Sequence, residues 1–133
     1  MDAAQALADL TEISSQIESA VLFDEEGAVL GSTLADESAA RAFAQSAAGL
    51  LEGAAAFRTS EAAVTQLDAS TREGSVFVVR DGARRIAART GPSPTVGLVF
   101  YDLKSCLRGT AEEPPAAKPK ARPRRKKETV DET

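Results

Sequence analysis

The segment from residue 75 to residue 90, SVFVVRDGARRIAART, decides the fold of this chain. It contains two strand-like runs, residues 75–80 and 84–90, and Asp81-Gly82 lies between them. An Asp-Gly pair in such a place is a strong hairpin signal, because a type I′ turn needs positive φ at both central residues. The run 76–79 is apolar without alternation, which is typical of a strand covered on both faces. The segment therefore predicts a hairpin inside a sheet that lies between two layers.

Three more strands are expected upstream of this hairpin. Residues 63–70 form the nearest one, with Leu67 facing the opposite side from Gln66 and Asp68. Farther upstream, residues 19–23 and 28–33 flank a turn that starts with Asp24 and has Gly27 in fourth position, as a type I turn favours. The sheet is thus predicted to have five strands.

Two helices are predicted around the first hairpin. Asp2 and Gln5 make a start that resembles a capping box, and Leu7, Leu10, Ile13 and Ile17 follow at helical spacing, so a first helix should run to about residue 15. Asp36 can cap a long helix from residue 37 to about residue 58. Its polar residues form one narrow stripe, made of Arg41, Gln45, Gly49 and Glu52. The rest is more apolar than one sheet-facing side requires, so another macromolecule is expected to cover part of this helix.

The last predicted helix covers the segment before Gly109. Ser93 and Pro94 suit its N-cap and first turn, and Gly109 suits its end. Its apolar face would consist of Val96, Val99, Phe100, Leu103 and Leu107. Residues 96–101 also fit a buried strand, because they are rich in β-branched and aromatic side chains. The helix is preferred, which predicts an α+β, sandwich-like fold of order α-β-β-α-β-β-β-α, with the long helix on one sheet face and the terminal helices on the other.

Composition divides the chain into one domain, residues 1–108, and a tail, residues 109–133. The domain has nine basic and 15 acidic side chains, while the tail has seven and five and holds four of the six prolines. Such a tail cannot offset its ordering entropy, so it is predicted to be disordered. Its cations are Lys118, Lys120, Arg122, Arg124, Arg125, Lys126 and Lys127. They predict either weak electrostatic contact with an anionic membrane, nucleic acid or acidic protein, or a solubilising role.

Missing residue types exclude several kinds of chemistry. The chain has no histidine and a single cysteine, Cys106, so catalytic triads with histidine, multi-cysteine zinc sites and internal disulfides are excluded. No P-loop pattern, secretory signal or membrane-spanning run is present, and the chain is predicted to be cytoplasmic and to need no cofactor or metal. Catalysis by Asp or Glu alone is the remaining enzymatic alternative, and no carboxylate pair stands out for it.

Four segments of the chain resemble the roadblock/dynein light chain family, in particular its bacterial members that regulate Ras-like small GTPases. The segments are AVLFD at 20–24, GAVLGS at 27–32, GSVFVVR at 74–80 and GPSPTVGLV at 91–99. The resemblance implies a homodimer in which the third strands pair and the long helices pack together. The interface residues would be Ala40, Ala44, Ala47, Ala48 and Ala55 on the helix, and Val64, Gln66 and Asp68 on the strand. Ordinary packing of the helix on its own sheet is the alternative role of the alanines.

The expected function is that of a non-catalytic, dimeric regulatory or scaffold protein for a Ras-like GTPase, with Arg41, Gln45 and Glu52 facing the partner. A small-molecule sensor, or an interaction domain without a GTPase, is the alternative. Four arginines near the 81–82 turn, Arg80, Arg84, Arg85 and Arg89, could supply a GTPase-activating finger, or they could serve only solubility and protection of the sheet edge. The acidic residues at 24–26 are interpreted as part of an ordinary turn and not as a divalent-cation site, and Cys106 is interpreted as an inert packed thiol.

Overall fold

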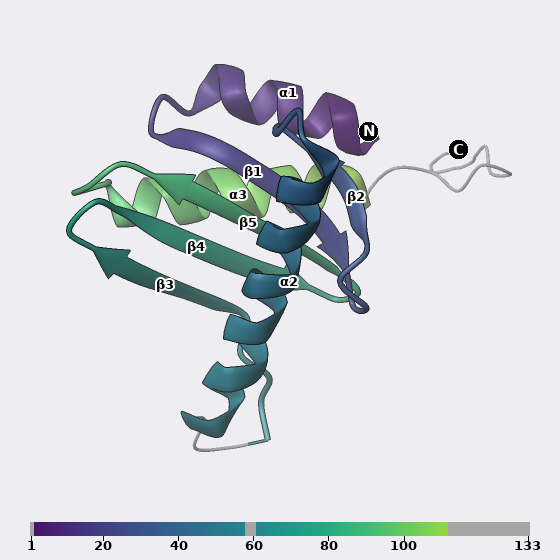
Figure 1. Ribbon diagram of the computed structural model, residues 1–133, viewed down its shortest axis with the longest axis vertical. Coiled ribbons are helices and arrows are strands. Elements are labelled where there is room, and N and C mark those ends of the chain that lie inside the picture. Colours follow the sequence, from purple (N-terminus) through teal and green to yellow (C-terminus); the bar gives the residue numbers. More distant parts are fainter. Residues whose placement is uncertain (1, 58–60, 112–133) are drawn as a thin grey trace, which may run out of the picture.

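The computed structural model describes residues 2–57 and 61–111. Along the chain these residues form α1 (Ala3–Ile13), β1 (Ile17–Asp24), β2 (Val29–Ser32), α2 (Glu37–Ala54), a 3-10 turn η1 (Ala55–Phe57), β3 (Gln66–Thr71), β4 (Gly74–Asp81), β5 (Arg84–Thr90) and α3 (Val96–Ala111). Helix α2 crosses one face of the sheet, and α1 and α3 lie side by side on the other (Figure 1). The predicted element order and the predicted fold class are therefore confirmed. None of the described helices is both long enough and apolar enough to cross a membrane.

The five strands form one antiparallel sheet of order β2-β1-β5-β4-β3. The hairpin predicted at 75–90 is present, with Asp81 paired to Arg84 and Val78 paired to Ala87. Its turn differs from the prediction. Only one of the two central residues, Gly82, has positive φ, at 64°. One positive φ at the first central position is the property of a type II′ turn, in which Gly supplies that conformation without steric cost.

Apolar side chains of the sheet alternate between two cores. Phe77 and Val79 of β4 pack with Leu10 of α1 and Leu103 of α3. Val78, between them in sequence, packs on the other face against α2. Because successive side chains of a strand point to opposite faces, an uninterrupted apolar run fills both cores at once. The prediction that β4 is covered on both faces is confirmed.

Residues 96–101, which also fitted a strand in the sequence, are helical in the structure and belong to α3. Both ends of α3 differ from the prediction. Ser93 is not the N-cap: it has φ of 60°, and the first helical backbone bond runs from Val99 N to Thr95 O at 3.0 Å. At the other end the helix continues past Gly109 to Ala111, so residues 109–111 belong to α3 and not to the tail. The guanidinium of Arg84 donates to the carbonyl of Thr110 at 2.5 Å, which supplies a partner for one of the last carbonyls of the helix.

Other predicted boundaries shift by a few residues. Strand β3 begins at Gln66 instead of residue 63, and α1 ends at Ile13, so that Ile17 belongs to β1. The predicted tail from residue 112 onward, with all seven of its cations, lies outside the described residues.

Candidate interaction surface

The inner side of α2 packs on the sheet through small side chains. Ala40, Ala44 and Ala47 are 3%, 0% and 1% exposed, and they lie in one cluster with Val78 and Ala87 of the sheet. Alanines at this spacing allow the helix backbone to approach the strands closely. These three residues are therefore fully used within one chain and cannot contact a second helix. This corrects the interface inferred for them and assigns them to ordinary helix-on-sheet packing.

The predicted polar stripe lies on the outer side of α2. Arg41, Gln45 and Glu52 are all exposed. Within the part of the chain that the structure describes, none of their side chains forms a hydrogen bond or an ion pair. Arg41 also lines a hollow of about 520 Å³ between the start of α2 and the edge strand β2. The structure thus places the three side chains on one accessible surface and leaves them free to bind a partner.

The C-terminal part of α2 extends past the edge strand β3, beyond the area of the sheet (Figure 1). Two large apolar side chains near this part of the helix are exposed: Leu50, at 41%, over the β3–β4 strip of the sheet, and Phe57, at 85%, just after α2. The remaining predicted interface residues of the helix, Ala48 and Ala55, are half-buried.

Strand β3 is an open edge next to this helix end. Gln66 and Asp68 are exposed, and Val64, just before the strand, is half-buried against the α2 core. On the face that carries α2, Ala69 and Val76 line a hollow of about 230 Å³ together with Leu50. Glu18, Glu73 and Arg89 also line this hollow. This strip of sheet and the helix side above it form a mixed apolar and polar surface, which we call the β3 surface.

The four arginines around the 81–82 turn do not form one cluster. Arg84 lies on the face that carries α3 and holds the end of that helix, as described above. Arg85 donates to the carbonyl of Gly82 at 3.1 Å and so stays within its own turn. Arg89 lines the hollow of the β3 surface near the opposite end of the strand, where it is paired with Ser19 and Val76. Two of the four are thus engaged in holding the fold.

The acidic turn before β2 uses its first carboxylate internally. Oδ1 of Asp24 accepts hydrogen bonds from the backbone N–H groups of Glu26 at 2.9 Å and Ala28 at 3.0 Å. Gly27 has φ of 85°, a conformation that favours glycine. This geometry agrees with the interpretation of the segment as a turn.

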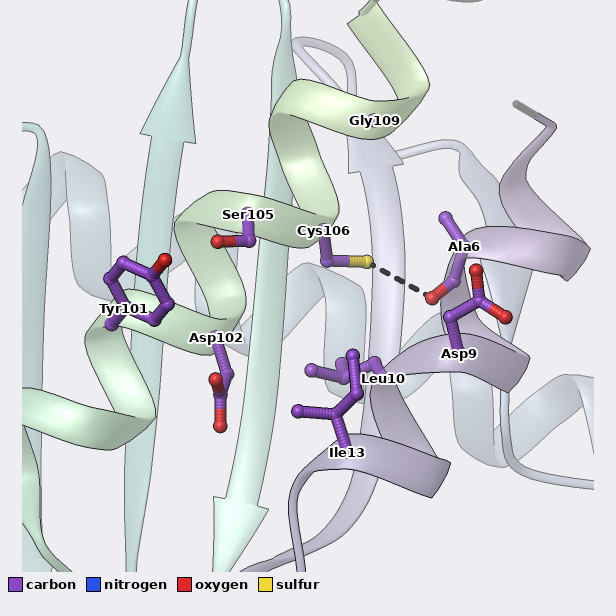
Figure 2. Close-up of a pocket in the computed structure, with 9 residues that line it drawn as sticks. All are labelled: Ala6, Asp9, Leu10, Ile13, Tyr101, Asp102, Ser105, Cys106 and Gly109. Carbon is purple, nitrogen blue, oxygen red and sulfur yellow. Dashed lines mark hydrogen bonds between the residues drawn. The ribbon is translucent and has the colours of Figure 1, made fainter.

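A groove between α1 and α3, on the face opposite α2, was not expected from the sequence. It measures about 290 Å³, and its walls include Ile13 of α1 with Tyr101, Asp102 and Cys106 of α3 (Figure 2). Ile13 is 72% exposed and Tyr101 is 63% exposed, whereas Asp102 is only 6% exposed. The one sequence signal for it is Asp102 itself, which interrupts the apolar face between Val99 and Cys106.

Cys106 lies in the wall of this groove, and its thiol donates to the carbonyl of Ala6 at 3.6 Å (Figure 2). Burial, and to a smaller extent the charge of Asp9, raises the pKa of the thiol from 9.0 to about 11. Because the thiolate is the reactive form, a raised pKa makes the group inert at neutral pH. The geometry agrees with the interpretation of Cys106 as a packed thiol.

We predict that at pH 8 a neutral thiol-reactive reagent modifies Cys106 about 100-fold more slowly in the folded chain than in the urea-unfolded chain. The reason is that the pKa of the thiol is about 11 in the folded chain and 9.0 in the unfolded chain, so the folded chain has about 100-fold less thiolate. The rate in the folded state should keep rising up to about pH 11, whereas that of the unfolded chain should level off near pH 9. The measurement is the absorbance of the released thiol product as a function of pH. Equal rates for the two states at pH 8 would contradict the buried placement.

No protein-family model and no curated protein matches the sequence. Solved structures do match. The roadblock/LC7 domain from Streptomyces avermitilis is 19% identical and superposes with a TM-score of 0.75 over 84% of this chain and 96% of that one. The gliding protein mglB from Thermus thermophilus is 17% identical, with a TM-score of 0.69 over 82% and 85%. A structure of MglB with a tetrameric arrangement is 18% identical, with a TM-score of 0.63 over 82% and 85%. The chain therefore has the fold of the roadblock/LC7 domains, as the sequence resemblance implied.

Proposed function

We propose that this chain is a non-catalytic, dimeric regulatory or scaffold protein that binds a Ras-like small GTPase and modulates its nucleotide cycle or its location. The observation that carries the proposal is the division of α2 into three surfaces. One side is buried on the sheet, the outer side presents Arg41, Gln45 and Glu52 without partners among the described residues, and the C-terminal end extends past the edge strand β3. One helix thereby offers one surface to a second copy and another to a partner.

The dimer part of the proposal rests on the β3 surface. An unpaired edge strand invites pairing with another strand, and most folds protect such an edge by a charge, a bulge or a cover. Here Leu50 and Phe57 are exposed beside it. Pairing β3 with its symmetry mate would satisfy the edge and bring two copies of the helix end together around a twofold axis. The tetrameric arrangement of the MglB neighbour supports assembly through this fold.

The GTPase part rests on the family resemblance and on the outer side of α2. A partner surface needs exposed side chains that are not already used within the chain, and Arg41, Gln45 and Glu52 meet this condition within residues 2–57 and 61–111. Arginine is a frequent anchor in protein interfaces because its planar group can make several directed hydrogen bonds. In this proposal, any nucleotide chemistry is carried out by the partner.

We expect Arg41→Glu to weaken binding to the GTPase by about 30-fold or more, because loss of an interface anchor typically costs about 2 kcal/mol. Binding would be measured by calorimetry with a panel of bacterial Ras-like GTPases in GDP and GTP forms, and hydrolysis would be followed in the same samples. Lys104→Glu is the matched control, since Lys104 is an exposed cation on α3, across the sheet. Its effect should stay below about threefold. Equal effects of the two variants, or no binding to any GTPase in either nucleotide form, would overturn the proposal.

A further inference from the structure

The groove between α1 and α3 contains a carboxylate that has no partner in the part of the chain that the structure describes. Asp102 is 6% exposed, and its side chain points toward the Ile13 end of the groove (Figure 2). Among residues 2–57 and 61–111, no side chain or backbone group forms a hydrogen bond or ion pair with it. Among the described residues only Ser14 Oγ is a fully buried polar side-chain atom without a partner, so the Asp102 oxygens still reach the groove and can pair with a cation that enters it.

The other walls of the groove agree with a cationic, partly apolar ligand. Asp9 of α1 contributes a second carboxylate, and no lysine or arginine is among the nine residues that line the groove. The two cations of α3, Lys104 and Arg108, line a separate hollow, although the guanidinium of Arg108 also donates to Oγ of Ser105 in the groove wall at 3.3 Å. Exposed Ile13 and Tyr101 would cover the aliphatic part of a lysine or arginine side chain, or a proline ring, beside the charge.

The charges of the chain are distributed so that it can supply this cation itself. Residues 1–40, which include α1 and the edge strand β2, hold nine carboxylates and no basic residue. Residues 118–127 hold seven cations and no carboxylate. Such blocks of opposite sign attract each other over roughly the Debye length, which is about 10 Å at 0.1 M salt.

The place where the tail begins also favours this pairing. Gly109 lines the groove and α3 ends at Ala111, so the tail starts at one end of the groove. Lys118 is seven residues farther on, and an extended segment of that length spans about 24 Å. An 11-residue helix such as α1 is about 16 Å long, so the cations can reach every part of the groove. Pro114, Pro115 and Pro119 reduce the conformational freedom that docking would remove.

We propose that residues 118–127 of the tail bind in the α1–α3 groove of the same chain, with a lysine or arginine paired to the carboxylate of Asp102. Docking would shield Ile13 and Tyr101 and would withhold the tail cations from other anionic partners. The proposal does not depend on the GTPase, because the groove lies on the sheet face opposite α2.

The chain offers a reporter for the test, because Tyr101 is its only tyrosine and it has no tryptophan. The full chain would be compared with a tail-neutral chain, in which the seven cations are replaced by glutamine, by tyrosine fluorescence quenching with acrylamide and by amide NMR spectra. At 0.1 M salt the wild type should show weaker quenching and different Asp102 and Tyr101 amide shifts. Raising the salt to 1 M, where the Debye length is about 3 Å, should remove both differences. Identical spectra for the two chains at 0.1 M salt would overturn the proposal.

Two further variants test the role of the carboxylate. Asp102→Asn keeps the shape of the side chain and removes the charge, so it should reproduce the tail-neutral spectra. Asp81→Asn makes the same chemical change at the exposed end of β4 and should behave like the wild type. The tail-neutral comparison stands by itself if Asp102→Asn does not fold. Wild-type behaviour of a folded Asp102→Asn chain would refute the pairing.

A mixed sample distinguishes the tail of the same chain from that of a second copy. Isotope-labelled tail-neutral chain would be mixed with unlabelled wild type under conditions that exchange subunits, and only the labelled groove would be observed. If the tail binds within its own chain, the labelled amides keep the tail-neutral shifts. Recovery of the wild-type shifts would show that the tail binds the groove of another copy and would overturn the proposal as stated.

Discussion

Replacing Phe77 by Ala is expected to lower the free energy of unfolding by about 3–5 kcal/mol, the usual cost of removing a buried phenylalanine. Phe77 is 0% exposed in β4, and its ring meets that of Phe100 edge to face, with centroids 5.0 Å apart and planes at 79°. The contact joins the sheet to α3, so truncation leaves a cavity between two elements that cannot close it easily. Aromatic pairs of this geometry contribute about 0.5–1.5 kcal/mol beyond the area that they bury.

Urea denaturation followed by circular dichroism would measure this loss, and a thermal scan should show the midpoint falling by more than about 10 °C, since about 1 kcal/mol shifts it by roughly 4–8 °C in a domain of this size. Tyr101→Ala is the matched control, because it removes an aromatic ring that is 63% exposed next to Phe100 on the same helix. Its effect should stay within about 0.5 kcal/mol, as for most surface positions. A similar loss for both variants would show that the Phe77 ring is not in a packed core.

The second large effect is expected for Leu50→Asp, which should dissociate the proposed dimer. Leu50 is 41% exposed at the β3 surface, where a second copy would cover it. Because the interface is twofold, each substitution acts twice. Two losses of about 2 kcal/mol each correspond to roughly a thousandfold increase in the dimer dissociation constant. Light scattering and sedimentation at micromolar concentration should show a monomer with an unchanged fold.

Leu98→Asp provides the control for this experiment. Leu98 is 49% exposed on α3, on the sheet face opposite α2, so the same chemical change is made at similar exposure but outside the proposed interface. This variant should keep the association state of the wild type. A monomeric wild type at these concentrations, or dissociation by both substitutions, would contradict the β3 surface as the site of assembly.

Much of the fold follows from short-range patterns. The Asp-Gly turn, the apolar run of β4 and the cap at Asp36 each lie within a few residues, and local propensity and turn chemistry act over that range. One error occurs where a contact from a distant residue is present. Helix α3 does not stop at Gly109, because Arg84, 26 positions away from Thr110, supplies a partner for a terminal carbonyl. The prediction that α3 ends at Gly109 used only the local preference of glycine for helix ends, which contains no information about Arg84.

The candidate surface could also be predicted only in part from local patterns. Helical spacing alone placed Arg41, Gln45 and Glu52 on one side of α2, and the structure confirms that all three are exposed. The same spacing could not say which of the remaining sides faces the sheet. Ala40 and Ala48 both fit a close helix contact in the sequence, but only Ala40 is fully buried on the chain's own strands.

By itself, the amino-acid sequence determined the number and order of the elements, the two-sided burial of the sheet and the absence of histidine chemistry, since each depends on periodicity, turns or composition. Only the tertiary structure decided that the apolar end of α2 extends past β3, that Arg84 holds the end of α3, and that Asp102 faces a groove without a partner among the described residues. These features arise where elements distant in the chain meet. Their free energies depend on which surfaces cover each other, and no local pattern records that.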